Sequence, residues 1–190
     1  MLLPAAVDPR KQFLAARMKA TRAFMTGDFT LSSGKKSDVY LDCRMLTLDS
    51  KSLPFIVSFM AETLDAEEME PNRVGGLSAG ADPLIAGFLC NGWRSMKGFF
   101  ARKEPKKHGT LKLVEGHLSA GDKVIIVDDV LTTGGSIKKC ADDVIQHGGN
   151  IIASIVIVDR EEGGKEALAD YRFPVYSLIT LKEVREILGE

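Results

Sequence analysis

The stretch "VIIVDDVLTTGGS" (residues 124–136) decides the fold. Its first four residues are apolar and β-branched, which is typical of a strand buried on both faces of a parallel sheet. Two adjacent carboxylates, Asp128 and Asp129, come next. A turn rich in hydroxyls and glycine then leads into a predicted helix at Ser136. The stretch therefore predicts a strand, a turn and a helix in immediate succession.

This order of elements predicts a ligand site. Ligands of open parallel sheets bind beyond the carboxyl ends of the strands, where Asp128 and Asp129 are expected. A glycine-rich turn before a helix leaves backbone N–H groups free for an anion, and hydroxyls add donors. The carboxylates can accept hydrogen bonds from neutral hydroxyls nearby. A phosphate beside a pair of hydroxyls describes a ribose 5-phosphate, held by Thr132, Thr133, Gly134, Gly135 and Ser136.

Two other interpretations of the stretch fit it less well. Ser136 could simply begin a helix beside two incidental surface aspartates, but the strand–turn–helix context favours a site. A Walker P-loop is a poor match, because no Gly-Lys-Ser/Thr sequence follows the strand.

The pattern around the stretch indicates the fold class. Short apolar strands at 74–77, 97–101, 124–127, 151–158 and 175–179 alternate with helices, including 82–90 and 136–146. Strands and helices in this rhythm predict an α/β fold with a doubly wound, mainly parallel sheet flanked by helices. A capping box at Thr180 and Glu183 predicts the start of a C-terminal helix.

The first 70 or so residues lack that rhythm. Asp8 and Pro9 predict a helix start, and Gly27 is expected to end that helix. The segment "FTLSSGKKSDVYLD" predicts a hairpin with Gly34 in its turn. We therefore predict one domain over residues 1–190, with an N-terminal hood at about 1–70 and a ligand-binding core at about 71–190.

Composition narrows the functional class. Lys and Arg (25) nearly balance Asp and Glu (26), so neither a nucleic-acid partner nor a membrane surface is expected. The apolar runs are too short to span a bilayer. Cys43, Cys90 and Cys140 are scattered and odd in number, which favours a reduced, cytoplasmic location over a disulfide framework or zinc site.

A second motif, "ARKEPKKHG" (residues 101–109), follows a predicted strand. Its cations are dense for a chain of net charge −1. Because like charges repel, the loop is expected to order only when an anion arrives. A solvated basic loop would explain the composition equally well. A neighbouring phosphate site favours an anion-binding loop.

Four motifs of the sequence resemble those of a known family. "VIIVDDVLTTGGS" is similar to the phosphoribosyl pyrophosphate (PRPP) motif of type I phosphoribosyltransferases. "RKEPKKHG" resembles the catalytic loop of orotate phosphoribosyltransferases, "FTLSSGKKSDVYLD" resembles their N-terminal signature, and "VDREEGG" (residues 158–164) resembles their orotate-side segment. The four motifs occur in the family's order between about residues 29 and 164.

The resemblance implies a role for each motif. The acid pair would hold the ribose hydroxyls, and the turn from Thr132 to Ser136 would hold the 5-phosphate. Catalytic and PRPP-binding roles would fall to Asp128 and Asp129 together with Arg102, Lys103, Lys106 and His108. Orotate would meet Arg160, whose guanidinium suits a carboxylate, as well as Thr132 and an aromatic at Tyr40.

The chain departs from the family pattern at two positions. Many members carry lysine where this chain has Ser32 and Gly80. Backbone N–H groups in "LSAGADP" are expected to bind pyrophosphate instead, with Asp82 capping the next helix and Pro83 at its first position.

The implied activity is the transfer of ribose 5-phosphate from PRPP to orotate in pyrimidine biosynthesis. Mg²⁺ would arrive mainly with PRPP, because the chain offers no ligand cage of its own. A homodimer that shares its basic loops between subunits is also implied. Two alternatives remain: a purine phosphoribosyltransferase, which would not need Arg160 or the "RKEPKKHG" loop, and a PRPP-sensing regulator.

Overall fold

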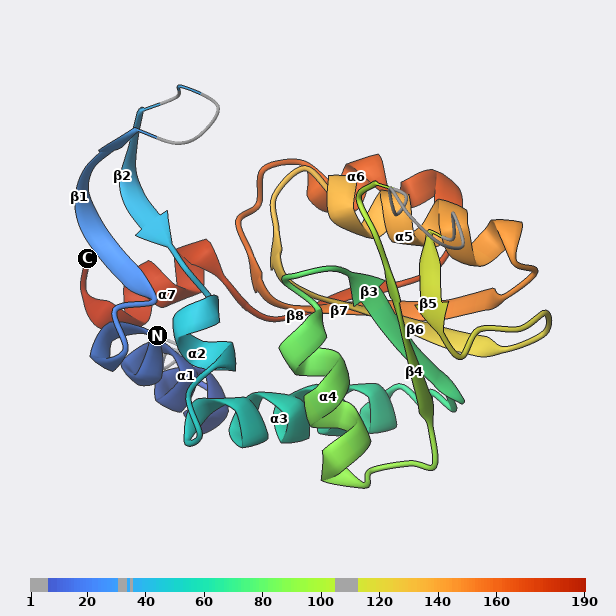
Figure 1. The fold of residues 1–190 in the computed structure, drawn as a ribbon. Coiled ribbons are helices and arrows are strands. Elements are labelled where there is room, and N and C mark those ends of the chain that lie inside the picture. Colours follow the sequence, from blue (N-terminus) through green and yellow to red (C-terminus); the bar gives the residue numbers. More distant parts are fainter. Residues whose placement is uncertain (1–6, 31–33, 35, 105–112) are drawn as a thin grey trace, which may run out of the picture.

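A computed structural model describes residues 7–30, 34, 36–104 and 113–190. Its main sheet has six strands in the order β5-β4-β3-β6-β7-β8 (Figure 1). All neighbouring strands run parallel except β5, which pairs antiparallel with β4 at one edge. The strand bounds are β3 Arg73–Leu77, β4 Lys97–Ala101, β5 Val114–Gly116, β6 Lys123–Leu131, β7 Asn150–Asp159 and β8 Val175–Thr180. The predicted α/β class with a mainly parallel sheet is confirmed.

Helices cover both faces of this sheet. In Figure 1, α5 (Gly135–Gln146) and α6 (Gly164–Ala167) lie above it, and α3 (Ser52–Ala66) and α4 (Asp82–Asn91) lie below it. A short 3₁₀ helix, Ala169–Tyr171, follows α6. Helices α1 (Pro9–Ala20) and α7 (Leu181–Leu188) pack on each other beside α3. Each face therefore has its own apolar core, as expected for a parallel sheet buried on both sides.

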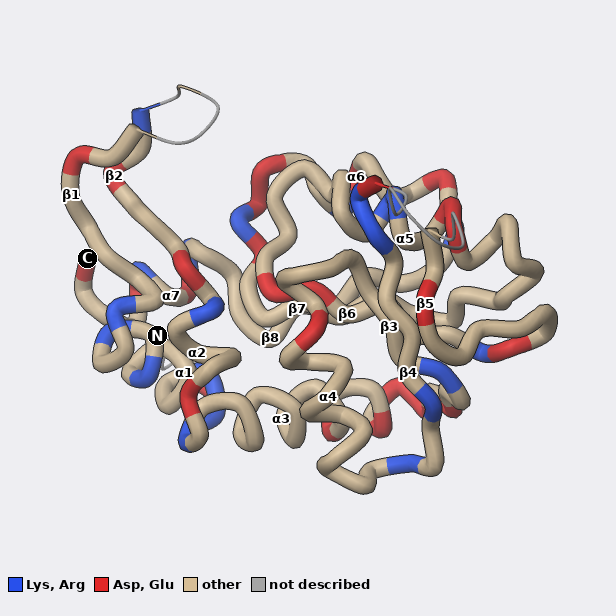
Figure 2. Tube along the Cα trace, viewed as in Figure 1, with Lys and Arg blue, Asp and Glu red and all other residues tan. Residues whose placement is uncertain are grey.

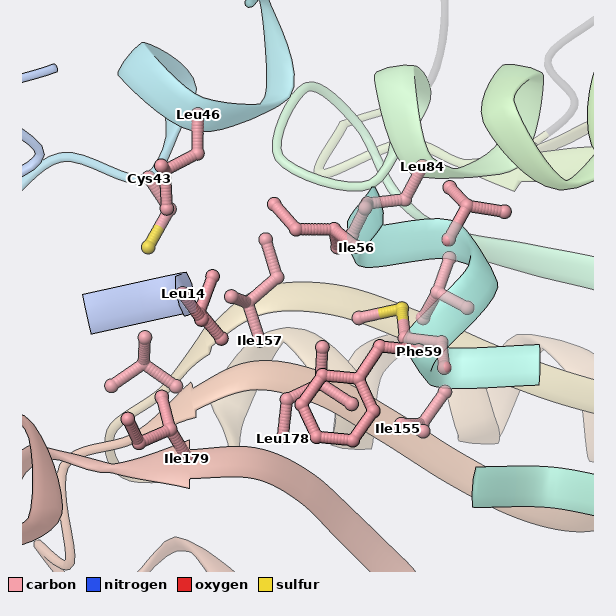
Figure 3. Close-up of a cluster of buried hydrophobic side chains, with 14 of the residues drawn as sticks. Leu14, Cys43, Leu46, Ile56, Phe59, Leu84, Ile155, Ile157, Leu178 and Ile179 are labelled. Carbon is pink, nitrogen blue, oxygen red and sulfur yellow. The ribbon is translucent and has the colours of Figure 1, made fainter. Parts of the chain in front are cut away.

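The larger core joins the N-terminal helices to the sheet. Figure 3 shows Leu14 of α1, Ile56 of α3 and Leu84 of α4 converging on Ile155 of β7 and Leu178 of β8. These side chains are at most 1% exposed. The first 70 residues thus contribute directly to the core below the sheet as well as to the hairpin.

The predicted hairpin stands apart from the sheet. Strands β1 (Phe24–Thr30) and β2 (Lys36–Leu41) form a separate antiparallel pair that projects upward in Figure 1. Gly34, in the turn, has φ +81°, a value that glycine adopts without steric cost. A short helix, α2 (Arg44–Thr47), leads from β2 back to the core, where Cys43 and Leu46 are buried.

Three local predictions were wrong. The first helix ends at Ala20, with Thr21 as its C-cap, and not at Gly27, because residues 24–30 pair with β2 as a strand. Strand β6 does not stop at Val127 but runs to Leu131. Asp82 does not cap α4: Ala81 is the N-cap, and the Asp82 carboxylate accepts a hydrogen bond from Ser78 Oγ instead.

The predicted capping box at the start of α7 is confirmed, and its contribution to stability can be measured. Thr180 Oγ1 accepts from the Glu183 amide at 3.2 Å, and Glu183 Oε2 accepts from the Thr180 amide at 2.9 Å. Thr180→Ala should lower the free energy of unfolding by about 1 kcal/mol, because an amide at the helix start loses its acceptor. Urea denaturation measures this, with Thr180→Ser as the control that keeps the hydroxyl. Equal losses in both variants would contradict the capping role.

Candidate functional site

The acid pair lies inside the end of strand β6. Asp128 is paired in register with Val156 of β7, so the strand continues through both carboxylates. Asp128 Oδ1 accepts from the Asp129 amide at 3.0 Å, and Asp129 Oδ1 accepts from the Val130 amide at 2.8 Å. These bonds hold both carboxylates at the carboxyl end of the central strand, which is where the sequence placed a ligand site.

Burial makes the pair electrostatically unusual. Asp128 is only 6% exposed. Desolvation, followed by the charge of Asp129, raises the pKa of Asp128 well above its ordinary value. Burial also raises the pKa of Asp129. Figure 2 shows acidic residues where β6 and β7 meet, on the side of the sheet that faces the hairpin. The pair is therefore expected to bind partners that donate hydrogen bonds or carry positive charge.

The turn from Thr132 to Ser136 after β6, called the cradle below, has the geometry expected of an anion site. Gly134 is the N-cap of α5 and has φ +77°, and a Cβ at this position would lie 3.0 Å from the Gly164 carbonyl oxygen. Only glycine meets both conditions without strain. The amides of Gly135, Ser136 and Ile137 open α5, where no carbonyl one turn earlier can accept from them. These donors at a helix N-terminus favour a phosphate.

A cavity of about 400 Å³ joins the cradle to Asp128 of the acid pair. Its walls include Asp128, the whole turn from Thr132 to Ser136, and Lys103 from the end of β4. The positive charge of Lys103 acts against the rise in the pKa of Asp128. The structure thus brings together a carboxylate, a phosphate cradle and a cation that the sequence separates by some 25 positions.

Gly80, one of the two positions where lysine was expected, lies beside the acid pair. A Cβ at position 80 would lie 3.1 Å from an oxygen of Asp128 and 3.1 Å from an oxygen of Asp129. The loop between β3 and α4 therefore passes directly against the acid pair, and a side chain there would press on both carboxylates. The other missing lysine, at Ser32, lies outside the described residues.

The basic loop is only partly described. Arg102 Nε donates to Glu115 Oε1 on β5 at 2.6 Å, and its guanidinium lies 5.7 Å from the centre of the Phe100 ring. Arg102 is not among the residues that line the 400 Å³ cavity, whereas its neighbour Lys103 is. Lys106 and His108 lie outside the described residues.

A second cavity, of about 670 Å³, lies between the hairpin and the core. Arg160, directly after β7, lines it together with Phe29 and Lys36 of the hairpin. The Arg160 amide donates to the Leu131 carbonyl at 2.9 Å, which places this arginine beside the cradle. Tyr40 does not line the cavity, but its ring centre lies 5.6 Å from that of Phe29. Its predicted contact with a base therefore stays a prediction.

Several residues of these cavities were not found from the sequence. Lys139 lines the first cavity, with its ammonium 2.7 Å from the buried carboxylate of Asp143. Glu162 and Arg185 line the second. Arg185 Nη2 lies 2.7 Å from Asp38 Oδ1 and so links α7 to the hairpin. Ion pairs between such distant segments leave no short-range pattern, although "DREE" does place an acid two residues after Arg160.

Within residues 7–30, 34, 36–104 and 113–190, no three His, Cys, Asp or Glu side chains gather as a metal site. Asp128 and Asp129 nevertheless supply carboxylate oxygens, the donors that Mg²⁺ prefers. Two such residues fit a cation whose other ligands come from a bound substrate. No helix in the described part of the chain is long and apolar enough to cross a membrane.

The fold and the site together define a phosphoribosyltransferase. A doubly covered parallel sheet carries an acid pair and a phosphate cradle at the carboxyl end of β6. The family model for the phosphoribosyl transferase domain matches residues 99–178.

Comparison with known proteins narrows this class. Orotate phosphoribosyltransferase of Rhodopirellula baltica is 40% identical over 170 residues, covering 86% of this chain and 88% of the relative. The crystal structure of orotate phosphoribosyltransferase from Aeropyrum pernix has a TM-score of 0.83 and 37% identity, with 93% of this chain and 98% of that chain covered. The chain belongs to the orotate phosphoribosyltransferase family.

Two further structures bear on the site and the fold. The Mycobacterium tuberculosis H37Rv orotate phosphoribosyltransferase, solved in complex with PRPP, has a TM-score of 0.78 and 29% identity, covering 93% of this chain and 99% of that chain. The adenine phosphoribosyltransferase of Leishmania donovani is 15% identical, with a TM-score of 0.67 over 93% of this chain and 81% of that chain. That second likeness shows the fold alone.

The raised pKa of Asp128 predicts a pH-dependent cost in stability. A carboxyl group whose pKa is higher in the folded than in the unfolded state stabilises the fold while protonated. This contribution is lost as pH rises from about 4, the unfolded value, through the raised folded value. Asp128→Asn cannot ionise and should unfold at a higher temperature than wild type near pH 8. We expect the free energy of unfolding to increase by on the order of 1 kcal/mol, since each pKa unit is worth about 1.4 kcal/mol.

Thermal unfolding monitored by circular dichroism at pH 5 and pH 8 measures this difference. The gain should shrink at pH 5, where the wild-type carboxyl group is largely protonated. Asp170→Asn, which changes an exposed carboxylate, is the control. If Asp128→Asn raised the unfolding temperature equally at both pH values, ionisation of Asp128 would not be what limits stability.

Proposed function

We propose that the two cavities bind PRPP and orotate side by side, so that the ribose lies between them. The overall activity is PRPP-dependent orotate phosphoribosyltransferase activity, EC 2.4.2.10, in pyrimidine biosynthesis. The observation that supports the assignment of sites is that the cradle, Asp128 and Lys103 line one cavity, and that Arg160, just after β7, lines a second.

PRPP fits the first cavity by its chemistry. The 5-phosphate accepts from the amides at the start of α5 and from the hydroxyls of Thr132, Thr133 and Ser136. The ribose hydroxyls donate to Asp128 and Asp129. Pyrophosphate then lies toward Lys103 and the loop at Gly80, whose backbone passes close to the acid pair. The Mycobacterium tuberculosis relative with bound PRPP supports this assignment.

Orotate fits the second cavity through its carboxylate. The side chain of Arg160 is 11% exposed, and a partly desolvated guanidinium binds a planar carboxylate strongly with two parallel hydrogen bonds. Thr132 lies at the boundary between the cavities, because Arg160 is bonded to the residue before it. The aromatic Phe29 and, next to it, Tyr40 offer flat faces to a pyrimidine ring.

The reaction exchanges one bond at C1 of the ribose. The bond from C1 to the pyrophosphate oxygen breaks, and that oxygen keeps the electron pair. N1 of orotate supplies the electron pair of the new bond, and its proton leaves to water or to the departing pyrophosphate. Bound Mg²⁺ supplies charge neutralisation on the pyrophosphate oxygens. Lys103 stabilises the charge on the leaving group, the acid pair orients the ribose, and the filled cavities exclude water. No protein nucleophile is needed.

The two basic residues after β4 support a shared active site. Lys103 lines the cavity of its own chain, whereas Arg102 is bonded to Glu115 and does not. We propose that the chain forms a two-fold homodimer in which Arg102, Lys106 and His108 of the loop serve the neighbouring site, while Lys103 serves the site of its own chain.

We also propose a cytoplasmic location, which the three scattered cysteines led us to expect. All three cysteines are free.

The first functional prediction concerns metal and substrate. Purified protein should consume orotate only when PRPP and Mg²⁺ are both present. The fall in orotate absorbance measures this consumption. Uracil lacks the carboxylate and should react at least 100-fold less efficiently, because a partly buried guanidinium is then left unpaired. Arg160→Ala should remove most of this discrimination. Equal efficiency of the wild type with uracil and orotate would contradict the role of Arg160.

The second concerns the shared loop. Lys106→Ala removes a loop cation, and Asp129→Asn weakens the contact with the ribose hydroxyls, so each homodimer should be poorly active. In a mixed dimer one site carries both lesions and the other carries neither. Random reassortment makes about half the dimers mixed, so co-refolding should restore about a quarter of wild-type activity.

Native mass spectrometry confirms that mixed dimers form, and the orotate assay reads the activity. A mixture of Lys106→Ala with wild type is the control. It shows how subunit exchange by itself changes the activity. Mixed dimers that are no more active than the separate variants would place the loop in the site of its own chain.

A further inference from the structure

Arg160 is held by an ion pair that uses only one side of its guanidinium. Its Nε donates to Glu162 Oε1 at 2.6 Å. A guanidinium carries one N–H at Nε and four at the two Nη atoms. Within the described part of the chain, no hydrogen bond involves the Arg160 Nη atoms. The edge formed by these two nitrogens thus remains available to a ligand.

The turn that carries Glu162 is fixed by several contacts of its own. Asp159 is 4% exposed, and its Oδ1 accepts from the Glu161 amide at 2.8 Å. Lys165 Nζ lies 3.1 Å from Asp159 Oδ2. Glu161 and Gly163 adopt φ values of +58° and +86°. These constraints bring the Glu162 side chain back toward the residue two positions earlier, on the wall of the second cavity.

Charges around the second cavity are nearly balanced. Its lining includes three cations, Lys36, Arg160 and Arg185, and three acids, Asp28, Asp38 and Glu162. Two of these cations are already paired, Arg160 with Glu162 and Arg185 with Asp38. A general attraction for anions is therefore weak here, and a ligand's carboxylate must be recognised by directed hydrogen bonds.

We propose that Glu162 is a positioning residue that makes Arg160 specific for the carboxylate of the base. By occupying Nε, it fixes the plane of the guanidinium and presents the Nη edge for a bidentate contact. This inference rests on the proposed function, because it takes Arg160 as the arginine that binds orotate.

The test compares Glu162→Ala with Glu162→Gln. The alanine variant frees the guanidinium and should raise the KM for orotate about tenfold, since a hydrogen bond to a charged group is lost. The KM for PRPP and the efficiency with uracil should change less than about twofold, so discrimination between the bases falls. Glutamine keeps an acceptor for Nε and should restore most of the orotate KM. Glu166→Ala, an exposed glutamate on α6, is the matched control.

A double-mutant cycle with Arg160→Ala separates this inference from the proposed function. If Glu162 acts through Arg160, Glu162→Ala should have no further effect once Arg160 is removed. Additive effects, or equal losses with orotate and uracil, would overturn the positioning role. Orotate binding by calorimetry and thermal unfolding of each variant show whether a loss reflects binding or folding. If Arg160→Ala itself leaves base discrimination intact, the proposed orotate site is wrong, whatever Glu162 does.

Discussion

The acid pair at the end of β6, with Asp128 buried and Asp129 partly buried, constrains every other feature of the site. Two adjacent carboxylates with little solvent are costly, and their raised pKa values show that the free protein resists full ionisation. A ligand that brings hydroxyl donors and a cation relieves this cost. The approach of the loop at Gly80 and the placing of Lys103 in the same cavity are consistent with an acid pair that is completed by its substrate.

The two cavities suit different kinds of ligand for different physical reasons. The first combines helix-terminal amides, hydroxyls and Lys103, so it suits a highly charged phosphate ester. The second pairs its arginines with acids and adds the aromatic ring of Phe29, so it suits a flat ring with a single carboxylate. This division reduces the chance that either substrate binds in the other's place.

The departures from the family pattern acquire a physical meaning in the fold. A lysine at position 80 would add charge near pyrophosphate, but its Cβ would stand 3.1 Å from both carboxylates of the acid pair. With glycine there, the backbone itself can approach the substrate. In the proposed arrangement, positive charge near the leaving group comes from Lys103 and from the basic loop that follows it in the sequence.

The class of fold and the glycine-rich turn of the first cavity could be predicted from the sequence alone. Apolar β-branched runs and glycine-rich turns are short-range signals, so the parallel strands, the cradle from Thr132 to Ser136 and the α7 capping box could be predicted from local pattern. Strand ends were predicted less well: β6 continues through Asp128 because its pairing with β7 outweighs the low strand propensity of aspartate. Only the tertiary structure decided which distant residues meet, including Lys103 with Asp128, Arg185 with Asp38, and the hairpin with Arg160. Such contacts depend on how the elements pack around the two cores, and no short-range pattern in the chain records that packing.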